Sequence, residues 1–242
     1  MIRMAPADDP SILVPIDVSQ PAAPDPHLVE LLHPLRIVLL GYYLVPDQAA
    51  PDQLRAEYEA EATNTIERIA TEFLERGADV DPIVVFTRDR SASVDRVADE
   101  RGCDAVLTPG EATAIDRVLV PLRGDVNLER IVRVVAELLE ESHASATLYH
   151  GVGPDEDATE SEFILRGAVD RLVEDGVDED RLEWKQSETE SAADDIIARA
   201  EAYDLVVLGE TEPSLKEHIL GDVPSQIIDR TGRPVLVIRD VT

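Results

Sequence analysis

The chain repeats itself, and this repeat restricts the folds open to it more than any other feature. The stretch SASVDRVADERGCDAVLTPG, which begins at Ser91, matches SAADDIIARAEAYDLVVLGE, which begins at Ser191. Each copy opens with a Ser that can cap a helix and closes with an Asp followed by a short run rich in β-formers. Two copies of one structural unit are therefore expected.

Two further pairs of segments extend the repeat. SILVPID (residues 11–17) and RVLVPLR (residues 117–123) are apolar runs of the same form. ERGADVDPIVVFT, from Glu75, and EDGVDEDRLEWKQ, from Glu174, each combine a helix end, a Gly stop, an acidic turn and a strand. The correspondence indicates a duplication, with one domain over residues 1–113 and a second over residues 114–242.

Within each half, continuous apolar runs alternate with helical patterns. Apolar residues between 128 and 139 follow the spacing of an amphipathic helix, which Asp125 or Asn127 could cap. Apolar runs joined by helices are typical of parallel strands buried on both faces. The sequence predicts an α/β protein with two Rossmann-like or flavodoxin-like doubly wound parallel-sheet domains in tandem. Ligands of such sheets bind at the carboxyl ends of the strands.

The first half is shorter than the second. After Gly110 the chain runs through EATAIDRVLVPL directly into the second half, which leaves no sequence for a last helix and a last strand. Prolines between residues 20 and 34 also shorten the helix expected after the first strand. The first domain is therefore expected to lack its last strand.

The charge of the chain is strongly acidic. Its 51 Asp and Glu against 22 Lys and Arg give a formal net charge of -29, and the acids are spread over every expected helix. The negative charge suits a protein that binds cations or basic partners. It also suits adaptation to a cytosol of very high salt, because a Debye length of about 3 Å screens the repulsion among the acidic side chains. We favour adaptation to salt. Nucleic acid is not expected as a partner, because no basic patch is visible.

Several features place the chain in the cytoplasm. No apolar run reaches the roughly 20 residues of a membrane-spanning helix, and the first residues lack the pattern of a signal peptide. We therefore expect no membrane insertion. The one cysteine, Cys103, can form no internal disulfide and is expected to pack as a small buried apolar side chain.

Five segments of the chain resemble the universal stress protein (UspA-like) family in its tandem two-domain form. They are ILVPID, VLVPL, CDAVLTPG, YDLVVLGE and HILGDVPSQIIDRTGRPVLVIR. The resemblance covers nearly the whole chain and is closer in the second half. It implies a Rossmann-like fold, ATP binding in many members, and dimers formed by pairing of last strands. ATP-binding members share an Asp after the first strand and a loop written G-x2-G-x9-G-[ST], whose glycines and hydroxyls approach the phosphates.

The second half departs from this ATP motif. Arg123 replaces the Asp, Glu212 or Pro213 replaces the middle Gly, and Asp222 replaces the hydroxyl residue, whereas Gly209 and Gly221 match. A carboxylate about 4 Å from a phosphate costs roughly 4 kcal/mol at an effective dielectric near 20, or about three decades of affinity. Mg²⁺ between the two groups could offset this cost.

The first half departs differently, since Asp17 is kept but the phosphate loop has no sequence to form from. The resemblance thus implies a degenerate ATP site. Its candidate residues are Asp17, Pro121, Leu122, Arg123, Gly209, Gly221, Asp222, Val223 and Ser225.

Other candidate sites have weaker support in the sequence. No His spacing is typical of a metal site, and none is expected; His150 could face a ligand cleft, but a plain position at a loop edge is the commoner role. The acidic segment 153–162 could bind a divalent cation, but a solvated loop and helix start fits it better. Residues 42–53 are expected to form a long loop whose tyrosines stack on a base or, more commonly, pack.

These observations lead to one main expectation and two alternatives. The first is a cytoplasmic regulatory or stress-response protein that has no catalytic activity, needs no cofactor and acts by protein–protein contact, with nucleotide binding weak or lost. One alternative is an ATP-binding UspA-type protein that holds phosphate with Mg²⁺ and hydrolyses it slowly. The other is a regulatory partner of a membrane transporter. A homodimer is expected through the last strand, Val235 to Ile238.

Overall fold

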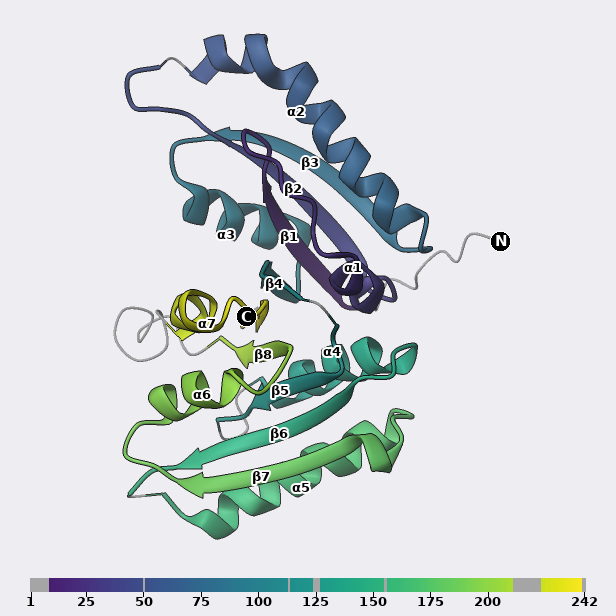
Figure 1. The fold of residues 1–242 in the computed structure, drawn as a ribbon, viewed down its shortest axis with the longest axis vertical. Coiled ribbons are helices and arrows are strands. Elements are labelled where there is room, and N and C mark those ends of the chain that lie inside the picture. The colour runs from purple at the N-terminus through teal and green to yellow at the C-terminus, as the bar shows by residue number, and fades with distance from the viewer. Residues whose placement is uncertain are drawn as a thin grey trace. The chain divides into compact units, whose positions relative to one another are not determined.

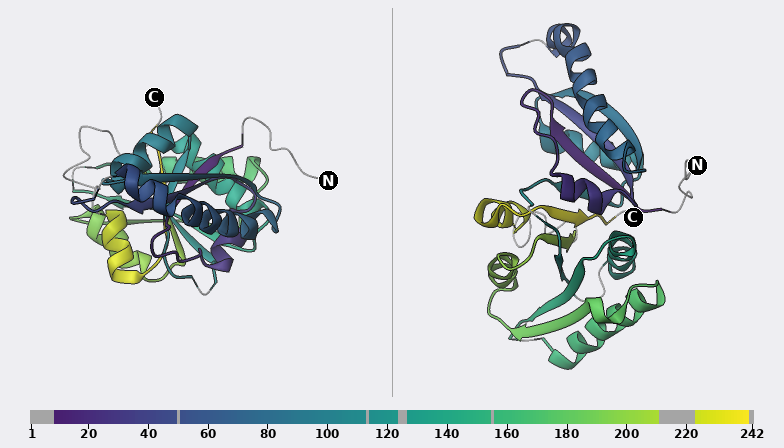
Figure 2. Two further views of the ribbon diagram at one scale, coloured as in Figure 1. Left: turned by 90° about the horizontal axis from the view of Figure 1, so that it is seen from above. Right: turned by 45° about the vertical axis from the view of Figure 1, so that its right-hand side comes forward.

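The computed structural model describes residues 9–49, 51–112, 114–123, 127–154, 156–210 and 223–240, with the side chains of 51 and 52 excepted. Contacts divide the chain into two compact units that meet between Leu107 and Thr108. Each unit is a parallel sheet with helices on both faces, as the views in Figures 1 and 2 show. The predicted fold class is confirmed.

Unit 1 contains four strands and three helices. They are β1 (Ser11–Asp17), α1 (Pro26–Leu32), β2 (Arg36–Leu44), α2 (Pro51–Leu74), β3 (Asp79–Thr87), α3 (Arg90–Arg101) and β4 (Ala105–Thr108). The strands lie in the order β3-β2-β1-β4 and pair in parallel. Helix α1 is short, as the prolines predict, and unit 1 ends at β4 without the further helix and strand of a complete domain.

Unit 2 has one more helix and one more strand among the described residues. Its elements are β5 (Arg117–Pro121), α4 (Leu128–Glu140), β6 (Ser145–Val152), α5 (Ala158–Glu174), a 3-10 turn (Glu179–Arg181), β7 (Leu182–Glu188), α6 (Ala192–Ala200), β8 (Leu205–Gly209), α7 (Val223–Thr231) and β9 (Val235–Ile238). The strand order is β9-β8-β5-β6-β7, and the pairing is parallel.

The repeat is visible in matching contacts at the start of each unit's first strand. The side chain of Asp104 accepts a hydrogen bond from the backbone N–H of Ser11 (2.9 Å), and that of Asp204 accepts one from the N–H of Arg117 (3.0 Å). In return, the N–H of Asp104 donates to the Ser11 carbonyl (2.8 Å) and the N–H of Asp204 to the Arg117 carbonyl (2.9 Å). We call each pair the strand latch of its unit.

The helix ends also show the repeat, with one exception. Gly77 follows α2 and Gly176 follows α5, and both have a positive φ (90° and 99°), which suits Gly because it has no Cβ. Ser191 caps α6 as predicted, through its bond from the N–H of Asp194. The prediction for Ser91 was wrong, because α3 begins at Arg90, which places Ser91 inside the helix, and Asp89, two residues before Ser91, supplies the capping carboxylate.

The amphipathic helix predicted over 128–139 is confirmed as α4, whose apolar stripe is buried. Its N-cap residue is Asn127, but the side chain of Asn127 does not cap the helix. It donates instead to the carbonyl of Glu210 (3.1 Å), at the end of β8. Cys103 is fully buried in the cluster between β1, β2 and α3, as expected.

The segment that leads into unit 2 packs tightly on the turn before β9. A Cβ added to Gly110 would lie 2.4 Å from the carbonyl oxygen of Gly232, closer than any side chain can approach. The N–H of Glu111 donates to the same carbonyl (2.7 Å). Gly110 is therefore required by this close approach of two backbone segments.

Candidate functional site

The carboxyl ends of the strands in unit 2 surround a cavity of about 490 Å³. Residues after β5, β6, β7 and β8 line it, together with Ile131 of α4 and the start of α6. This is the position at which open parallel sheets bind their ligands, and the volume lies within the usual range of small-molecule sites. The part of the chain that the structure describes thus has its candidate site at the predicted end of the sheet.

Four predicted site residues line the cavity: Pro121, Leu122, Arg123 and Gly209. A Cβ on Gly209 would lie 3.1 Å from Cδ1 of Ile131, so this Gly allows α4 to pack closely against β8. Gly209 therefore has a packing role whether or not it approaches a ligand.

The other predicted site residues lie elsewhere. Val223 is buried in the core beneath α6 and α7, and Ser225 is exposed on α7. Asp17 lies at the end of β1 in unit 1, where its carboxylate accepts bonds from the backbone and the hydroxyl of Ser19. Gly221 and Asp222, like Glu212, Pro213 and His218, fall outside the described residues.

His150 lies at the cavity and is buried, although the sequence favoured a plain loop edge. Its Nδ1 is 2.7 Å from the carbonyl oxygen of Leu122, and its Nε2 is 3.1 Å from the carboxylate of Glu156. His150 thereby ties the end of β6 to the loop before α5.

Glu156 turns back toward the sheet rather than into solvent. Its carboxylate accepts a bond from the backbone N–H of Gly153 (2.8 Å) as well as meeting His150. The Gly153 N–H is the main cause that holds the pKa of Glu156 below its usual range, with His150 and Arg123 acting in the same direction and partial burial opposing them. The later part of the acidic segment, from Asp157 to Glu162, forms the predicted helix start, where Asp157 caps α5.

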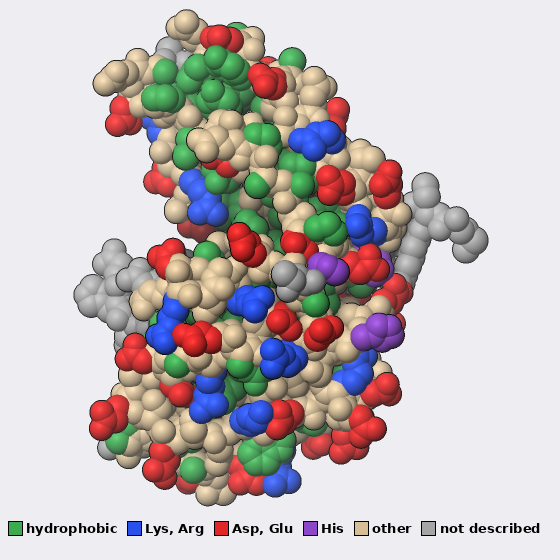
Figure 3. Space-filling model, viewed as in Figure 1, with side chains coloured by type: hydrophobic (Ala, Val, Ile, Leu, Met, Phe, Trp, Pro, Cys, Tyr) green, Lys and Arg blue, Asp and Glu red, His purple; other side chains and the backbone are tan. Residues whose placement is uncertain are grey.

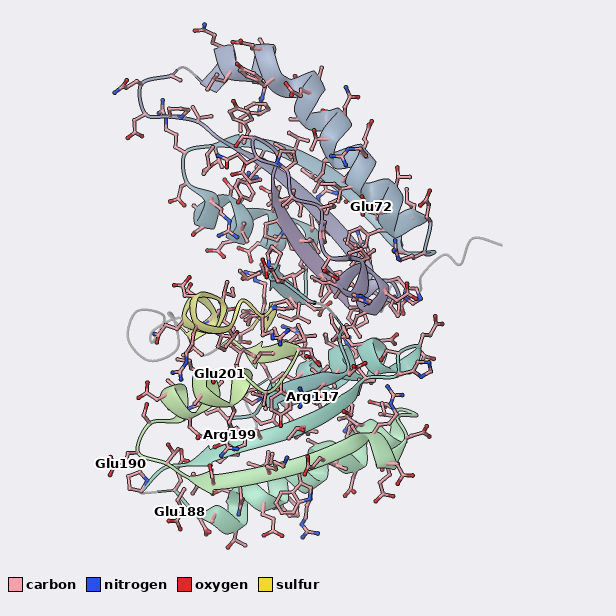
Figure 4. All side chains as sticks on the ribbon, in the orientation of Figure 1. Glu72, Arg117, Glu188, Glu190, Arg199 and Glu201 are labelled. Atoms are coloured by element: carbon pink, nitrogen blue, oxygen red, sulfur yellow. The ribbon has the colours of Figure 1, made fainter. Side chains whose placement is uncertain are left out.

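A polar cluster beneath the cavity holds one of its walls in place. The ring of Tyr149 is buried, and its hydroxyl hydrogen-bonds both Ser187 (2.6 Å) and the carboxylate of Asp195. Arg199, labelled in Figure 4, donates to Asp195 (2.9 Å) and lies 4.2 Å from the centre of the Tyr149 ring. The cluster joins β6, β7 and α6, so it fixes the orientation of the Tyr149 ring.

The corresponding end of unit 1 is occupied by aromatic side chains. Tyr42 and Tyr43 belong to β2, so the prediction that they lie in a loop was wrong. Tyr43 stacks between Tyr58 and Phe86, and the guanidinium of Arg90 lies 5.4 Å from the Tyr42 ring centre. Burial raises the pKa of Tyr42, and the nearby Arg90 charge opposes the rise.

Neither a metal site nor a membrane-spanning helix is found among the described residues. No group of three or more His, Cys, Asp or Glu is arranged there to hold a metal ion. No helix in the described ranges is long and apolar enough to cross a membrane.

Taken together, these features define an α/β protein of two repeated units with a cavity at the strand ends of its complete copy. The sequence model of the universal stress protein family matches residues 114–239, more than half of the chain. The chain therefore belongs to the universal stress protein family. A comparison with curated proteins gives no significant match.

Solved structures resemble the chain over nearly its whole length. A universal stress protein from Archaeoglobus fulgidus DSM 4304 has a TM-score of 0.65 at 16% identity, with 95% of this chain and 96% of that chain covered. A protein of unknown function from Pseudomonas aeruginosa PAO1 has a TM-score of 0.56 at 15% identity, with 96% and 93% covered. The cytoplasmic domain of a prokaryotic cation chloride cotransporter has a TM-score of 0.50 at 13% identity, with 95% of each chain covered. At these identities the likeness concerns the fold.

Proposed function

We propose that the protein is a non-catalytic cytoplasmic regulator of the universal stress protein family that acts by protein–protein contact, with nucleotide binding weak or lost. One observation carries the proposal: Glu156 already bonds two donors beside the cavity that an anionic ligand could use. Its carboxylate accepts from the N–H of Gly153 and lies 3.1 Å from Nε2 of His150. Glu210, which also lines the cavity, accepts a bond from the N–H of Asp240 (3.1 Å).

The charge of the cavity lining supports the same reading. Among the described residues that line the cavity, the charged side chains are one cation, Arg123, and three carboxylates, those of Glu156, Glu190 and Glu210. Each carboxylate near a phosphate raises the free energy of binding, by roughly 4 kcal/mol for a pair at about 4 Å and an effective dielectric near 20. A triphosphate would have to displace Glu156 and to approach like charges, unless Mg²⁺ lay between them.

Calorimetric titration of MgATP into the purified protein at molar KCl tests this proposal. The sample is first denatured and analysed by chromatography for nucleotide carried through purification. We expect no bound nucleotide and no binding at micromolar MgATP. Micromolar binding would favour the alternative, an ATP-binding member that holds phosphate through Mg²⁺ and Gly209, with Asp17, Gly221, Asp222, Val223 and Ser225 as further candidates.

A second candidate function is regulation of a membrane transporter by a separate chain. The similarity in fold to a cotransporter's cytoplasmic domain favours it, because that domain also spans nearly the full length of this chain. Co-purification with a transporter from the source membranes, abolished by removal of either unit, would support this candidate. A transporter whose flux is the same with and without the protein would contradict it.

The remaining expectations about partners and environment stay predictions. A homodimer through Val235 to Ile238 predicts twice the chain mass in light scattering across a range of protein concentrations. Adaptation to salt predicts that stability rises with KCl, because screening weakens repulsion among the acids that Figure 3 shows over the visible face of each unit.

A further inference from the structure

Helix α5 carries the most exposed large apolar side chain among the described residues. Phe163 lies on its outward face and is 78% exposed. The opposite face of the helix is buried against β6 and β7, and α4 lies beside it (Figure 1). Phe163 therefore takes no part in the core of unit 2, and its ring is available to another molecule.

A bare stretch of backbone lies one turn further along the same face. Gly167 follows Phe163 by four residues, which places both on one side of the helix. A Cβ added to Gly167 would have no atom within 4 Å, so packing within the described part of the chain does not require a glycine there. Gly in a helix interior lowers helix stability, but it lets a second backbone approach closely. Phe163 and Gly167 thus form a knob and a hollow on one face.

The equivalent helix of unit 1 has neither the knob nor the hollow. The repeat aligns Gly77 with Gly176 and so places α2 in register with α5. The buried positions correspond: Ala62, Ile66, Ile69 and Phe73 match Ser161, Leu165, Ala168 and Leu172. At the two outward positions, however, α2 has Asn64 and Arg68, which are both exposed. The knob and the hollow are therefore particular to α5, and the fold does not require them.

Charged side chains flank this face of α5. Arg166 pairs with Glu162 (2.8 Å) and lies 5.0 Å from the ring centre of Trp184, so its charge is offset and directed toward β7. On the other flank, Glu160 and Arg171 are both exposed. They are about three turns apart, so they lie on one side of the helix. One acid and one cation therefore stand at opposite ends of the same flank.

We propose that the outward face of α5 is a self-association surface through which two copies of this chain pair. The two helices run antiparallel about a twofold axis, and Phe163 of each copy packs into the hollow at Gly167 of the other. The midpoint of Phe163 and Gly167 is Leu165, and the midpoint of Glu160 and Arg171 falls directly after it. One axis at the level of Leu165 therefore also brings Arg171 opposite Glu160 of the other copy, twice.

A second copy is the occupant that this face fits, because the face supplies both halves of each contact. A contact made by one helix from each copy is small, and stable interfaces bury roughly 1,200 Å² or more, so we expect a weak dimer. The contact is separate from the homodimer expected through Val235 to Ile238, since α5 packs on β6 and β7 whereas β9 lies at the other edge of the unit 2 strand order. It does not depend on whether the cavity binds nucleotide.

Sedimentation equilibrium at molar KCl, over a range of protein concentrations, tests the knob. The average mass of the wild type should rise with concentration toward twice that of Phe163→Asn, which carries the residue type of the matching position in unit 1. This variant should weaken the pairing about tenfold and keep the unfolding temperature of the wild type. Leu74→Asn is the matched control, since Leu74 is 55% exposed on α2, and it should pair as the wild type does.

The variant Gly167→Gln tests the hollow and separates it from helix stability. Gln favours a helix more than Gly does, so the variant should raise the unfolding temperature. Its side chain also fills the hollow, so it should weaken the pairing about tenfold. A merely structural role of Gly167 would not combine a more stable fold with a weaker pair.

A disulfide tests the antiparallel register. Glu160→Cys and Arg171→Cys, introduced into one chain, place two thiols about 16 Å apart along the helix, which is too far for a bond within one copy. In the antiparallel pair each thiol meets the other type across the axis, so mild oxidation should give a covalent dimer. Each single variant should give none under the same conditions. The native thiol of Cys103 is fully buried and does not compete.

Four outcomes would overturn the inference. The first is a wild type with the same mass as Phe163→Asn at every concentration up to millimolar. The second is an equal loss of pairing in Phe163→Asn and Leu74→Asn, and the third is a Gly167→Gln protein that pairs as tightly as the wild type. The fourth is a covalent dimer that forms as fast from the single Cys variants as from the double variant. All four leave the proposed regulator standing, whereas micromolar MgATP binding would overturn that regulator and leave the α5 contact.

Discussion

The two units carry different residues at the carboxyl ends of their second strands, β2 and β6. In unit 1, β1 pairs Pro15 with Leu40, and two residues further along β2 comes Tyr42. In unit 2, β5 pairs Pro121 with Tyr149, and the residue two further along β6 is Gly151. Tyr42 thus takes the position of Gly151, a residue that lines the cavity in unit 2.

The residue before the repeated Ser also differs between the units. The repeat aligns Ser91 with Ser191 and hence Arg90 with Glu190. Arg90 lies against the Tyr42 ring, and Glu190 lines the cavity. The comparison teaches that one fold can keep its strand latches and helix ends while the carboxyl ends of its strands carry stacked aromatic rings in one copy and a larger cavity with acidic lining residues in the other.

Truncation of the buried side chain of Leu40, which corresponds to Tyr149 of unit 2, should give the largest effect. Leu40 is fully buried, so Leu40→Ala should lower the free energy of unfolding by about 2–5 kcal/mol. Tyr149→Phe keeps its ring and loses only hydroxyl bonds, so its cost should be about 1 kcal/mol. Urea unfolding followed by circular dichroism measures both. Leu44→Ala is the control, since Leu44 is 43% exposed; a similar loss there would show that burial does not set the difference.

The strand latches should respond alike. Asp104→Ala and Asp204→Ala each leave a backbone N–H of the first strand without its acceptor, so each should cost about 1–3 kcal/mol. The matching Asn variants keep an acceptor oxygen and should cost less. Urea titrations of the four proteins compare the units directly. A large loss in one unit with none in the other would show that the latch is not a shared element.

Removal of the N-cap side chain should destabilise each unit, but the N-cap residue lies at a different repeat position in each unit. Asp89→Ala should destabilise by about 1 kcal/mol because it removes the α3 cap, and Ser191→Ala should do the same for α6. Ser91→Ala should stay within about 0.5 kcal/mol, since Ser91 lies inside α3. Thermal unfolding of the three variants gives the ranking. If Ser91→Ala were the most harmful, the assignment of Asp89 as the cap would be contradicted.

The smallest effect concerns pH and distinguishes Glu156 from an ordinary surface carboxylate. Since the pKa of Glu156 is lowered below 4.5, its bonds stabilise the folded state above the usual carboxyl range. This stabilisation is lost as pH falls through the lowered pKa. A carbon-13 NMR titration of the Glu156 carboxyl should give a midpoint below 4.5. A midpoint at or above that value would show that the Gly153 N–H does not hold the carboxylate.

The order of elements could be predicted from sequence because the signals are local and occur twice. The glycines at 77 and 176, the apolar stripe of α4 and the strand runs all lie within short windows, and each recurs in the second copy. The missing end of unit 1 follows from length alone. The cap of α3 was misplaced because Asp89 and Ser91 are both good caps two residues apart, and only backbone geometry decides between them.

The site was predictable in position but not in chemistry. Pro121, Leu122, Arg123 and Gly209 reach the cavity because strand ends converge in a parallel sheet. The role of Glu156 was missed, because an acidic loop gives no signal that one of its carboxylates turns back to Gly153 and His150. The alignment of Tyr42 with Gly151 was available in the sequence, and it is the signal that could have shown which copy keeps an open end.

The central claim is that Glu156 occupies two donors beside the cavity, the Gly153 N–H and His150, that a phosphate could use. Titration of MgATP into the Glu156→Ala protein beside the wild type, at molar KCl, tests it most directly. The account predicts about tenfold tighter binding by the variant, because the Gly153 N–H and His150 are released and one negative charge is removed. Wild-type protein that binds MgATP as tightly as the variant, or a variant that binds none, would contradict the claim.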